Sequence, residues 1–284
     1  MTNRILSIFA SAFLVVGPAA AQQQKTAPAA KADSPDKPRA SSSIRRAADG
    51  HPDLSGNWAY AIDLAPAVLK KVTDGKLTTT VLDQSARHRA VENVPGSLPW
   101  TKTPSYKPEF KDKVADLSAR ETQTDGVFHC GRPGVPRIGS PRRIVQLPGE
   151  FIFLYEDISG DAYRIIPADG RKRREDANPS FYGDAVAHWE GDTLVVETTN
   201  FVDDTWIGED GYFHSDALRV VERFWRVGDN LAYQVTVHDP KVLTQPWTNF
   251  THVIKPSTQP LEESPICKED DAHRLVNLDH HLQR

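Results

Sequence analysis

Seven polar side chains lie within or beside apolar, β-rich runs, and together they could move a proton. The candidate catalytic residues are Glu156, His188, His214 and Glu222, and the candidate substrate-binding residues are Arg137, Tyr155 and Arg164. Burial raises the pKa of a carboxyl group toward the range useful for general acid–base catalysis, and histidine already titrates there. We therefore expect these side chains to converge on one cavity, where Arg164 anchors an anionic or phenolic group and a carboxylate or histidine transfers the proton.

Strand alternation groups the two glutamates with apolar neighbours. The face that carries Glu222 also carries Leu218, Val220, Phe224 and Arg226, and the face that carries Glu156 also carries Ile152 and Leu154. Two such carboxylates, near Arg164 and Arg226, indicate a polar cavity floor. The alternative is a set of buried carboxylate–guanidinium pairs that only tie strands together, because a lone buried charge is so costly that pairing is the rule.

The motifs that mark cofactor-dependent chemistry do not occur in the sequence. It has no Walker loop, no GxGxxG, no nucleophile elbow and no set of residues with metal-ligand spacing. We therefore expect no cofactor and no metal, and acid–base chemistry is the simplest enzymatic option.

The two cysteines, Cys130 and Cys267, are expected to form a disulfide. They are 137 residues apart, so closing this loop could stabilise the fold by about 4 kcal/mol. Their pairing depends on export to an oxidising compartment. A nucleophilic role for Cys130, which follows His129, is the alternative.

The elements that would position these residues are predominantly strands. Short β-rich runs separated by hairpin turns occupy 143–146, 151–156, 162–166, 185–189, 193–199, 218–226, 231–239 and 247–255. Two weaker helical patches lie at 66–72 and 111–120. This pattern predicts an all-β fold, an antiparallel lipocalin-like barrel or closed meander with peripheral irregular segments and short helices.

The N-terminal segment of the chain predicts export. Arg4, the apolar run 5–16 and the small residues before Gln22 are typical of a cleavable secretory signal over 1–21, too short for a permanent membrane span. Residues 22–50 have a composition too poor in apolar residues to fold alone and are expected to be a disordered tether. The remaining 51–284 are long enough for a single β-barrel-like domain in the periplasm or outside the cell.

The charge distribution limits the partners. The chain carries 34 Lys and Arg against 38 Asp and Glu. Seven of the basic residues but only three of the acidic residues precede position 51 and so lie outside the predicted domain. The predicted domain is therefore acidic. An acidic domain argues against nucleic acid or an anionic membrane surface as the main partner. The basic run 171–174 is interpreted as a solvated loop, with an anion site as the alternative. We expect a small-molecule ligand or substrate and no integral membrane segment after signal cleavage.

Several blocks resemble a widespread family of secreted bacterial proteins. The first, 51–58, ends in Gly56-Asn57-Trp58 and is similar to the G-x-W opening of lipocalin-like barrels; the others are 130–137, 188–197, 214–218 with Glu222-Arg223, and Asp239-Pro240 with Pro246-Trp247. The resemblance runs from about residue 51 to 269 and supports the domain boundaries and the disulfide. It implies no catalytic residues. Similar proteins tend to carry a basic residue before the tryptophan, a character that His188 keeps only partly.

Three functions are compatible with these features. The first is a cofactor-independent lyase, decarboxylase or isomerase acting on a small aromatic or lipophilic substrate; phenolic acid decarboxylases use barrels of this general kind, an analogy of fold alone. The second is a carrier or sensor that holds a lipophilic ligand unchanged, and the third is a cell-envelope interaction module. The number of titratable groups facing inward distinguishes the first two, because an enzyme needs an acid, a base and an anchoring cation within reach of one another.

Overall fold

The computed structural model describes residues 44–59, 68–81, 94–157, 159–160, 162–174, 176–264 and 266–268. These residues all belong to one structural unit, which begins at Ser41. The predicted signal segment, 1–21, and most of the predicted tether lie outside the described residues. Residues 44–50 of that tether are described, and there Arg46 forms an ion pair with Asp192, with 2.8 Å between Nη2 and Oδ2.

The first sheet has four antiparallel strands in the order β1-β4-β5-β6. The strands are β1 (Gly56–Asn57), β4 (Arg143–Leu147), β5 (Glu150–Tyr155) and β6 (Ala162–Pro167). The turn between β4 and β5 passes through Gly149, whose φ of 74° is one that residues with a Cβ rarely adopt. Hairpin turns between short β-rich runs thus produce the predicted meander.

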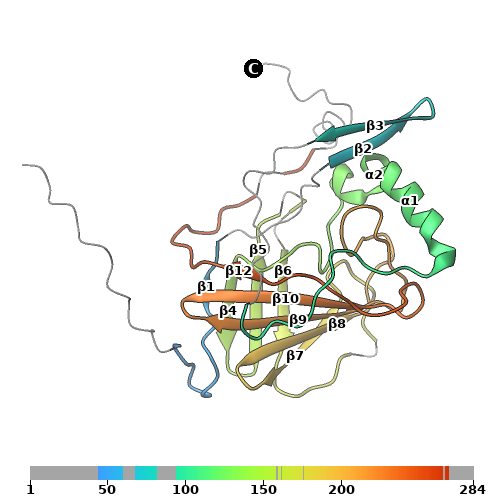
Figure 1. The fold of residues 1–284 in the computed structure, drawn as a ribbon. Coiled ribbons are helices and arrows are strands. Elements are labelled where there is room, and N and C mark those ends of the chain that lie inside the picture. The colour runs from blue at the N-terminus through green and yellow to red at the C-terminus, as the bar shows by residue number, and fades with distance from the viewer. Residues whose placement is uncertain are drawn as a thin grey trace, which may run out of the picture. The chain divides into compact units, whose positions relative to one another are not determined.

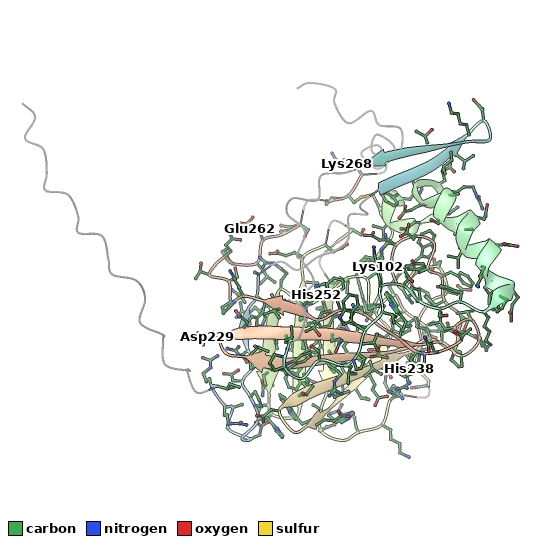
Figure 2. All side chains as sticks on the ribbon, in the orientation of Figure 1. Lys102, Asp229, His238, His252, Glu262 and Lys268 are labelled. Atoms are coloured by element: carbon green, nitrogen blue, oxygen red, sulfur yellow. A yellow bond between two sulfur atoms is a disulfide. The ribbon has the colours of Figure 1, made fainter. Side chains whose placement is uncertain are left out.

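The second sheet has six antiparallel strands. Its path is β11-β10-β9-β8-β7, and β12 also pairs with β10. The strands are β7 (Asp184–Glu190), β8 (Thr193–Thr199), β9 (Arg219–Val227), β10 (Asn230–His238), β11 (Trp247–Thr248) and β12 (His252–Ile254). Figure 2 shows Asp229, just before β10, and His238, the last residue of β10, at opposite ends of this strand. The antiparallel all-β fold is therefore confirmed.

Helices and one separate hairpin complete the described elements. The predicted helical patch at 111–120 contains α1 (Lys111–Ala119), followed by α2 (Glu121–Thr124), with the 3-10 turns η1 (Pro108–Phe110) and η2 (Gly126–His129) on either side. The helical prediction for 66–72 is wrong where the chain is described, because β2 (Val68–Thr73) pairs with β3 (Lys76–Val81). Asp74 and Gly75 both have positive φ and form the tight turn, which favours a hairpin over a helix.

The two larger sheets pack face to face around one apolar core. Phe153 of β5 meets Phe224 of β9 edge to face, with 5.1 Å between ring centroids. In Figure 1, β9 and β10 run across the view and β5 and β6 run behind them at a steep angle, as in an orthogonal β-sandwich. Within the described residues neither sheet closes on itself, so the expected closed barrel is not found there: β6 and β7 follow each other in the chain but do not pair.

The buried faces of the strands decide which candidate residues lie in the core. On β9 the buried face carries Val220, Glu222 and Phe224, as predicted. On β5 it carries Phe151, Phe153 and Tyr155, whereas Ile152 and Leu154 are only partly buried on the other face. Glu156 follows β5 on that second face. No helix among the described residues is long and apolar enough to cross a membrane.

Candidate functional site

The centre of the site is an ion pair between the two sheets. Arg164 of β6 and Glu222 of β9 face each other across the core, with 2.7 Å between Nη1 and Oε2. The arginine side chain is 4% exposed and the glutamate side chain is fully buried. Both residues occupy positions where strand alternation requires an inward side chain. The sequence therefore places two opposite charges in an otherwise apolar layer.

Three hydroxyl groups surround this ion pair. Tyr155, the last residue of β5, accepts a hydrogen bond from Arg164 Nη1 at 3.2 Å. Thr198 of β8 accepts one from Arg164 Nη2 at 2.8 Å. Tyr233 of β10 donates to Glu222 Oε1 at 3.3 Å. Five strands thus each contribute one polar side chain to a single cluster, which we call the core polar cluster: Tyr155, Arg164, Thr198, Glu222 and Tyr233.

Burial keeps the two phenols of the core polar cluster neutral. It raises the pKa of Tyr155 and of Tyr233 above the ordinary value, and the nearby Glu222 carboxylate raises each further. Arg164 lowers the pKa of both, but not enough to offset burial. At neutral pH both hydroxyl groups can therefore donate hydrogen bonds. Tyr155 uses its oxygen as an acceptor for Arg164, and its hydrogen has no acceptor within the described part of the chain.

Arg164 remains a cation in this apolar setting. Burial by itself lowers the pKa of the guanidinium, but the Glu222 carboxylate and the Tyr155 hydroxyl more than offset this effect, so the pKa is raised. Its Nε atom is buried without a hydrogen-bond partner among the described residues. The cluster consequently combines a permanent cation, a carboxylate and two neutral phenols, and each of these groups is within hydrogen-bonding or ion-pairing distance of at least one other.

Tyr182 is a further phenol close to the core polar cluster. It is only partly buried, and it is close enough to Tyr155 to raise the pKa of that phenol. Burial, followed by the nearby Asp157 carboxylate, raises the pKa of Tyr182 itself to about 12. The Arg132 guanidinium lies 6.0 Å from the centroid of the Tyr182 ring. Polar side chains therefore continue from the cluster toward the segment that carries the disulfide.

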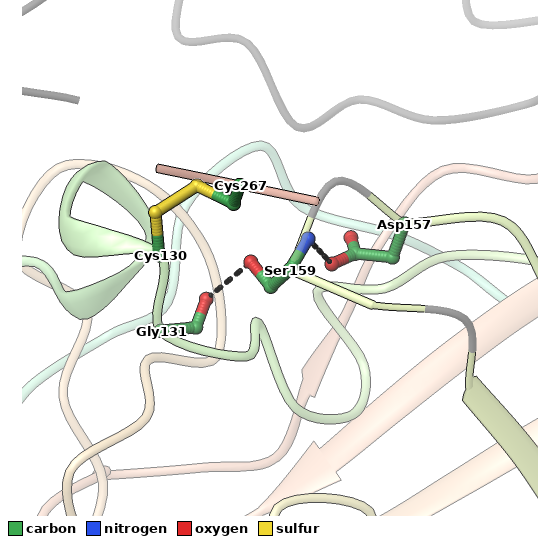
Figure 3. The surroundings of a disulfide bond; sticks show 5 residues. All are labelled: Cys130, Gly131, Asp157, Ser159 and Cys267. Carbon is green, nitrogen blue, oxygen red and sulfur yellow. Dashed lines mark hydrogen bonds between the residues drawn. A yellow bond between two sulfur atoms is a disulfide. The ribbon is translucent and has the colours of Figure 1, made fainter. Parts of the chain in front are cut away.

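The disulfide joins Cys130 and Cys267, as predicted, with 5.6 Å between their Cα atoms. No described cysteine is free, so the nucleophilic alternative for Cys130 is excluded. Figure 3 shows Ser159 Oγ donating to the carbonyl oxygen of Gly131 at 2.9 Å, while Ser159 N donates to Asp157 Oδ1. The residues after β5 are thus held against the residue that follows Cys130.

Glu156 is outside the core polar cluster, although the sequence grouped it with Glu222. It pairs with Arg142, with 2.7 Å between Oε2 and Nε, and its Oε1 accepts a hydrogen bond from the backbone N–H of Glu262. Arg142 in turn donates to the carbonyl oxygen of Trp58. For this carboxylate the alternative interpretation holds, because the pair ties β1, β5 and the C-terminal part of the chain together.

The two candidate histidines do not join Glu222 either. His188 on β7 is about half exposed and lies 3.4 Å from Glu190. His214 is buried in a loop, where Nε2 is 2.9 Å from Thr205 Oγ1 and Nδ1 is 2.9 Å from the carbonyl oxygen of Ser215. Both ring nitrogens of His214 therefore have local partners, which is what a buried structural histidine needs.

Arg137 belongs to a second buried ion pair. Its Nη1 lies 2.5 Å from Asp125 Oδ2, and its guanidinium is 6.0 Å from the centroid of the Trp206 ring. Asp125 also accepts a hydrogen bond from the backbone N–H of Val127 and so caps η2. Of the seven residues proposed from sequence, the structure therefore brings together Tyr155, Arg164 and Glu222, and it places Glu156, His188, His214 and Arg137 elsewhere.

Tyr233 and Thr198 were not among the sequence candidates. Tyr233 shares the inward face of β10 with Leu231, Val235 and Val237, so tracing the alternation through this strand would have found it. Thr198 lies opposite Val220 in the β8–β9 register. A threonine in a strand is too common to be singled out, and only the approach of Arg164 from the other sheet gives it a role.

A shallow depression of about 380 Å³ lies at the β1–β4 edge and includes no residue of the core polar cluster. Its lining residues are Arg45, Ser55, Gly56, Asn57, Arg143, Ile144 and Val145. The described residues contain no group of three or more His, Cys, Asp or Glu side chains that could hold a metal ion.

Comparisons with protein-family models, with curated proteins and with solved structures found no match. A functional assignment for this chain must therefore rest on the chemistry of its own residues.

Proposed function

We propose that this protein is a cofactor-independent acid–base enzyme, a lyase, decarboxylase or isomerase, that acts on a small aromatic substrate bearing a carboxylate or phenol. The observation that carries the proposal is the Arg164–Glu222 ion pair between two phenols in the middle of the core. Stability alone does not require such a group, because replacing a buried ion pair by apolar side chains is often neutral or stabilising.

Each member of the core polar cluster has a role in this proposal. Arg164 anchors the anionic group of the substrate, and the Tyr155 hydroxyl donates a hydrogen bond to it. Glu222 takes a proton from one substrate atom and returns it to another, so no oxidant or reductant is consumed. Tyr233, which donates to Glu222 Oε1, is a positioning residue that orients the carboxylate.

The location outside the cytoplasm belongs to the same proposal. It is supported by the signal-like segment 1–21 and by the Cys130–Cys267 disulfide, since disulfides persist in oxidising compartments. The similarity of the sequence blocks to secreted bacterial proteins supports it as well. We propose a periplasmic or secreted enzyme whose partner is its small-molecule substrate.

A panel of phenolic and aromatic carboxylic acids incubated with the protein in D2O tests the catalytic role. NMR detects both product formation and incorporation of deuterium at exchanged carbon positions. We expect at least one compound to react, and the double variant Arg164→Met/Glu222→Leu to slow this reaction by about 100-fold or more, the usual range for removal of an acid–base group. The double variant should still fold, because no buried charge is left unpaired.

Glu156→Gln is the matched control, because Glu156 is the carboxylate of a different ion pair outside the cluster. It should retain the wild-type rate. The proposal is wrong if the wild-type protein converts and exchanges none of the compounds, or if the double variant retains the wild-type rate.

A carrier of an anionic ligand is the second candidate, favoured by the single anchoring cation Arg164. In that case the same NMR samples would show line broadening of a bound compound but no exchange and no product. The double variant would then abolish the broadening.

A further inference from the structure

The outer face of the four-stranded sheet is apolar and exposed. Tyr163 is 66% exposed, Ile165 54% and Leu147 41%, all large values for hydrophobic side chains in strands. The same face carries the partly buried Val145, Ile152 and Leu154. We call these six residues the β4–β6 patch. Contiguous exposed apolar patches on a folded protein commonly mark interaction sites.

The register arranges the β4–β6 patch in rows across the strands. The middle row is Val145, Ile152 and Ile165, which lie opposite one another. One outer row is Arg143, Leu154 and Tyr163, and the other is Leu147, Glu150 and Pro167. The patch therefore has an apolar centre, an arginine near one end and a glutamate near the other.

The corresponding face of the six-stranded sheet is covered by the chain itself. Val94 packs with Trp225 and Ala232 in a small outer cluster. The backbone of Leu98 exchanges hydrogen bonds with the Gln234 side chain, and Trp225 Nε1 donates to the carbonyl oxygen of Pro95. The exposure of Leu147, Tyr163 and Ile165 shows that no described segment covers the β4–β6 patch to the same extent.

The two charged residues of the outer rows, Arg143 and Glu150, form no salt bridge within the described part of the chain. Arg143 is exposed. Arg171, whose own salt bridge is to Asp169, is close enough to Glu150 for the two charges to interact. Arg143 and Glu150 lie at opposite ends of one face. When a second copy of this face is laid on the first with its strands reversed, the arginine end of each copy meets the glutamate end of the other.

We propose that a second copy of this chain covers the β4–β6 patch, forming a symmetric dimer through the outer faces of the two four-stranded sheets. The two-fold axis runs along the middle row, so Ile152 of one protomer packs near Ile152 of its partner. This rotation reverses the strand direction and places the Arg143 end of each protomer over the Glu150 end of the other. Stacked sheets lie about 10 Å apart and neighbouring strands about 4.8 Å apart, distances that these two side chains together can span.

Sedimentation-velocity and equilibrium analysis of the full secreted chain over a range of concentrations tests this proposal. We expect reversible dimerisation that strengthens at low salt, because the two symmetry-related ion pairs are exposed to solvent. Ile165→Glu should abolish the dimer, because it places a carboxylate in the apolar centre of the interface. Ile266→Glu, the same substitution at an isoleucine that is 83% exposed outside the patch, should leave the dimer unchanged.

Charge reversal tests the orientation of the two copies. Arg143→Glu and Glu150→Arg should each raise the dissociation constant by about tenfold, since each creates two like-charge contacts. The double variant Arg143→Glu/Glu150→Arg should restore the wild-type value. A wild-type protein that stays monomeric up to about 1 mM overturns the dimer, because even a dissociation constant of that size would be detected. Dimerisation that is unchanged by Ile165→Glu overturns the assignment of this face.

Discussion

Buried arginines in this protein are paired with carboxylates, and pairing alone does not mark a functional site. Arg137 pairs with Asp125, Arg142 with Glu156 and Arg164 with Glu222, each with an N–O distance of 2.7 Å or less. The first two pairs tie loops and strand ends together. Only the third lies between the two sheets with a phenol on either side. The phenols, rather than the ion pair, distinguish the candidate site from a structural contact.

The buried phenols predict that stability falls at alkaline pH. The unfolded chain loses tyrosine protons near pH 10, whereas Tyr155 and Tyr233 keep theirs in the folded state because their pKa values are raised. Above pH 10 the folded state therefore binds more protons than the unfolded state, and stability must decrease as pH rises. Urea unfolding between pH 8 and 11 measures this decrease.

Tyrosine-to-phenylalanine variants identify the residues responsible. Tyr233→Phe should reduce the alkaline loss of stability, and it should cost about 1–3 kcal/mol at pH 8 because Glu222 loses a hydrogen-bond donor. Tyr163→Phe, at an exposed position, is the control and should change neither quantity. An alkaline loss that Tyr233→Phe leaves unaltered would show that Tyr233 titrates normally.

The strands differ in how deeply they anchor their aromatic side chains. Trp58 follows β1 and is 1% exposed. The Arg226 guanidinium carbon lies over it, 4.9 Å from the centroid of its ring. Trp189 on β7 is only partly buried. Its ring stacks on His51, with 4.5 Å between ring centroids, and meets Phe151 edge to face. The structure makes Trp58 part of the core and Trp189 part of its rim.

This difference predicts unequal costs of truncation. Trp58→Ala should reduce the free energy of unfolding by about 3–5 kcal/mol, the range for deletion of a buried large aromatic side chain. Trp189→Ala should cost less, since part of its surface is already in water. Chemical denaturation of both variants measures the order, and an equal or reversed order would contradict the burial of Trp58.

At the scale of the whole molecule, the disulfide links two distant parts of the chain. Cys130 lies just after η2 and Cys267 near the end of the described residues, 137 positions later. The covalent link therefore closes a loop that contains every strand from β4 to β12. A loop of this length restricts the unfolded chain much more than the folded one.

Removal of the disulfide should lower the free energy of unfolding by about 3–5 kcal/mol. The double variant Cys130→Ser/Cys267→Ser, compared with the oxidised wild type in urea, measures this loss. Reduced wild-type protein should match the variant, which separates loss of the link from effects of the serines. An unchanged unfolding midpoint would show that the unfolded chain is constrained in another way.

Sequence patterns alone determined the strands from β4 to β10, the disulfide and the inward position of Glu222. Hairpin turns and period-two alternation are local properties, so β4 to β10 were predictable from neighbouring residues. The pairing of Cys130 with Cys267 followed from their number and the expected compartment. At 68–73, by contrast, local propensity was misleading, because the strand depends on its pairing with β3.

Only the tertiary structure decided which carboxylate is central and which residues join it. Alternation divides β5 into two faces but does not say which face is buried; the contact of Phe153 with Phe224 puts Tyr155 inside and Glu156 outside. Because β6 and β7 do not pair, the strands form two packed sheets, and this packing brings Arg164 to Glu222, Thr198 and Tyr233. Contacts between sheets join residues far apart in the chain, and no local pattern encodes them.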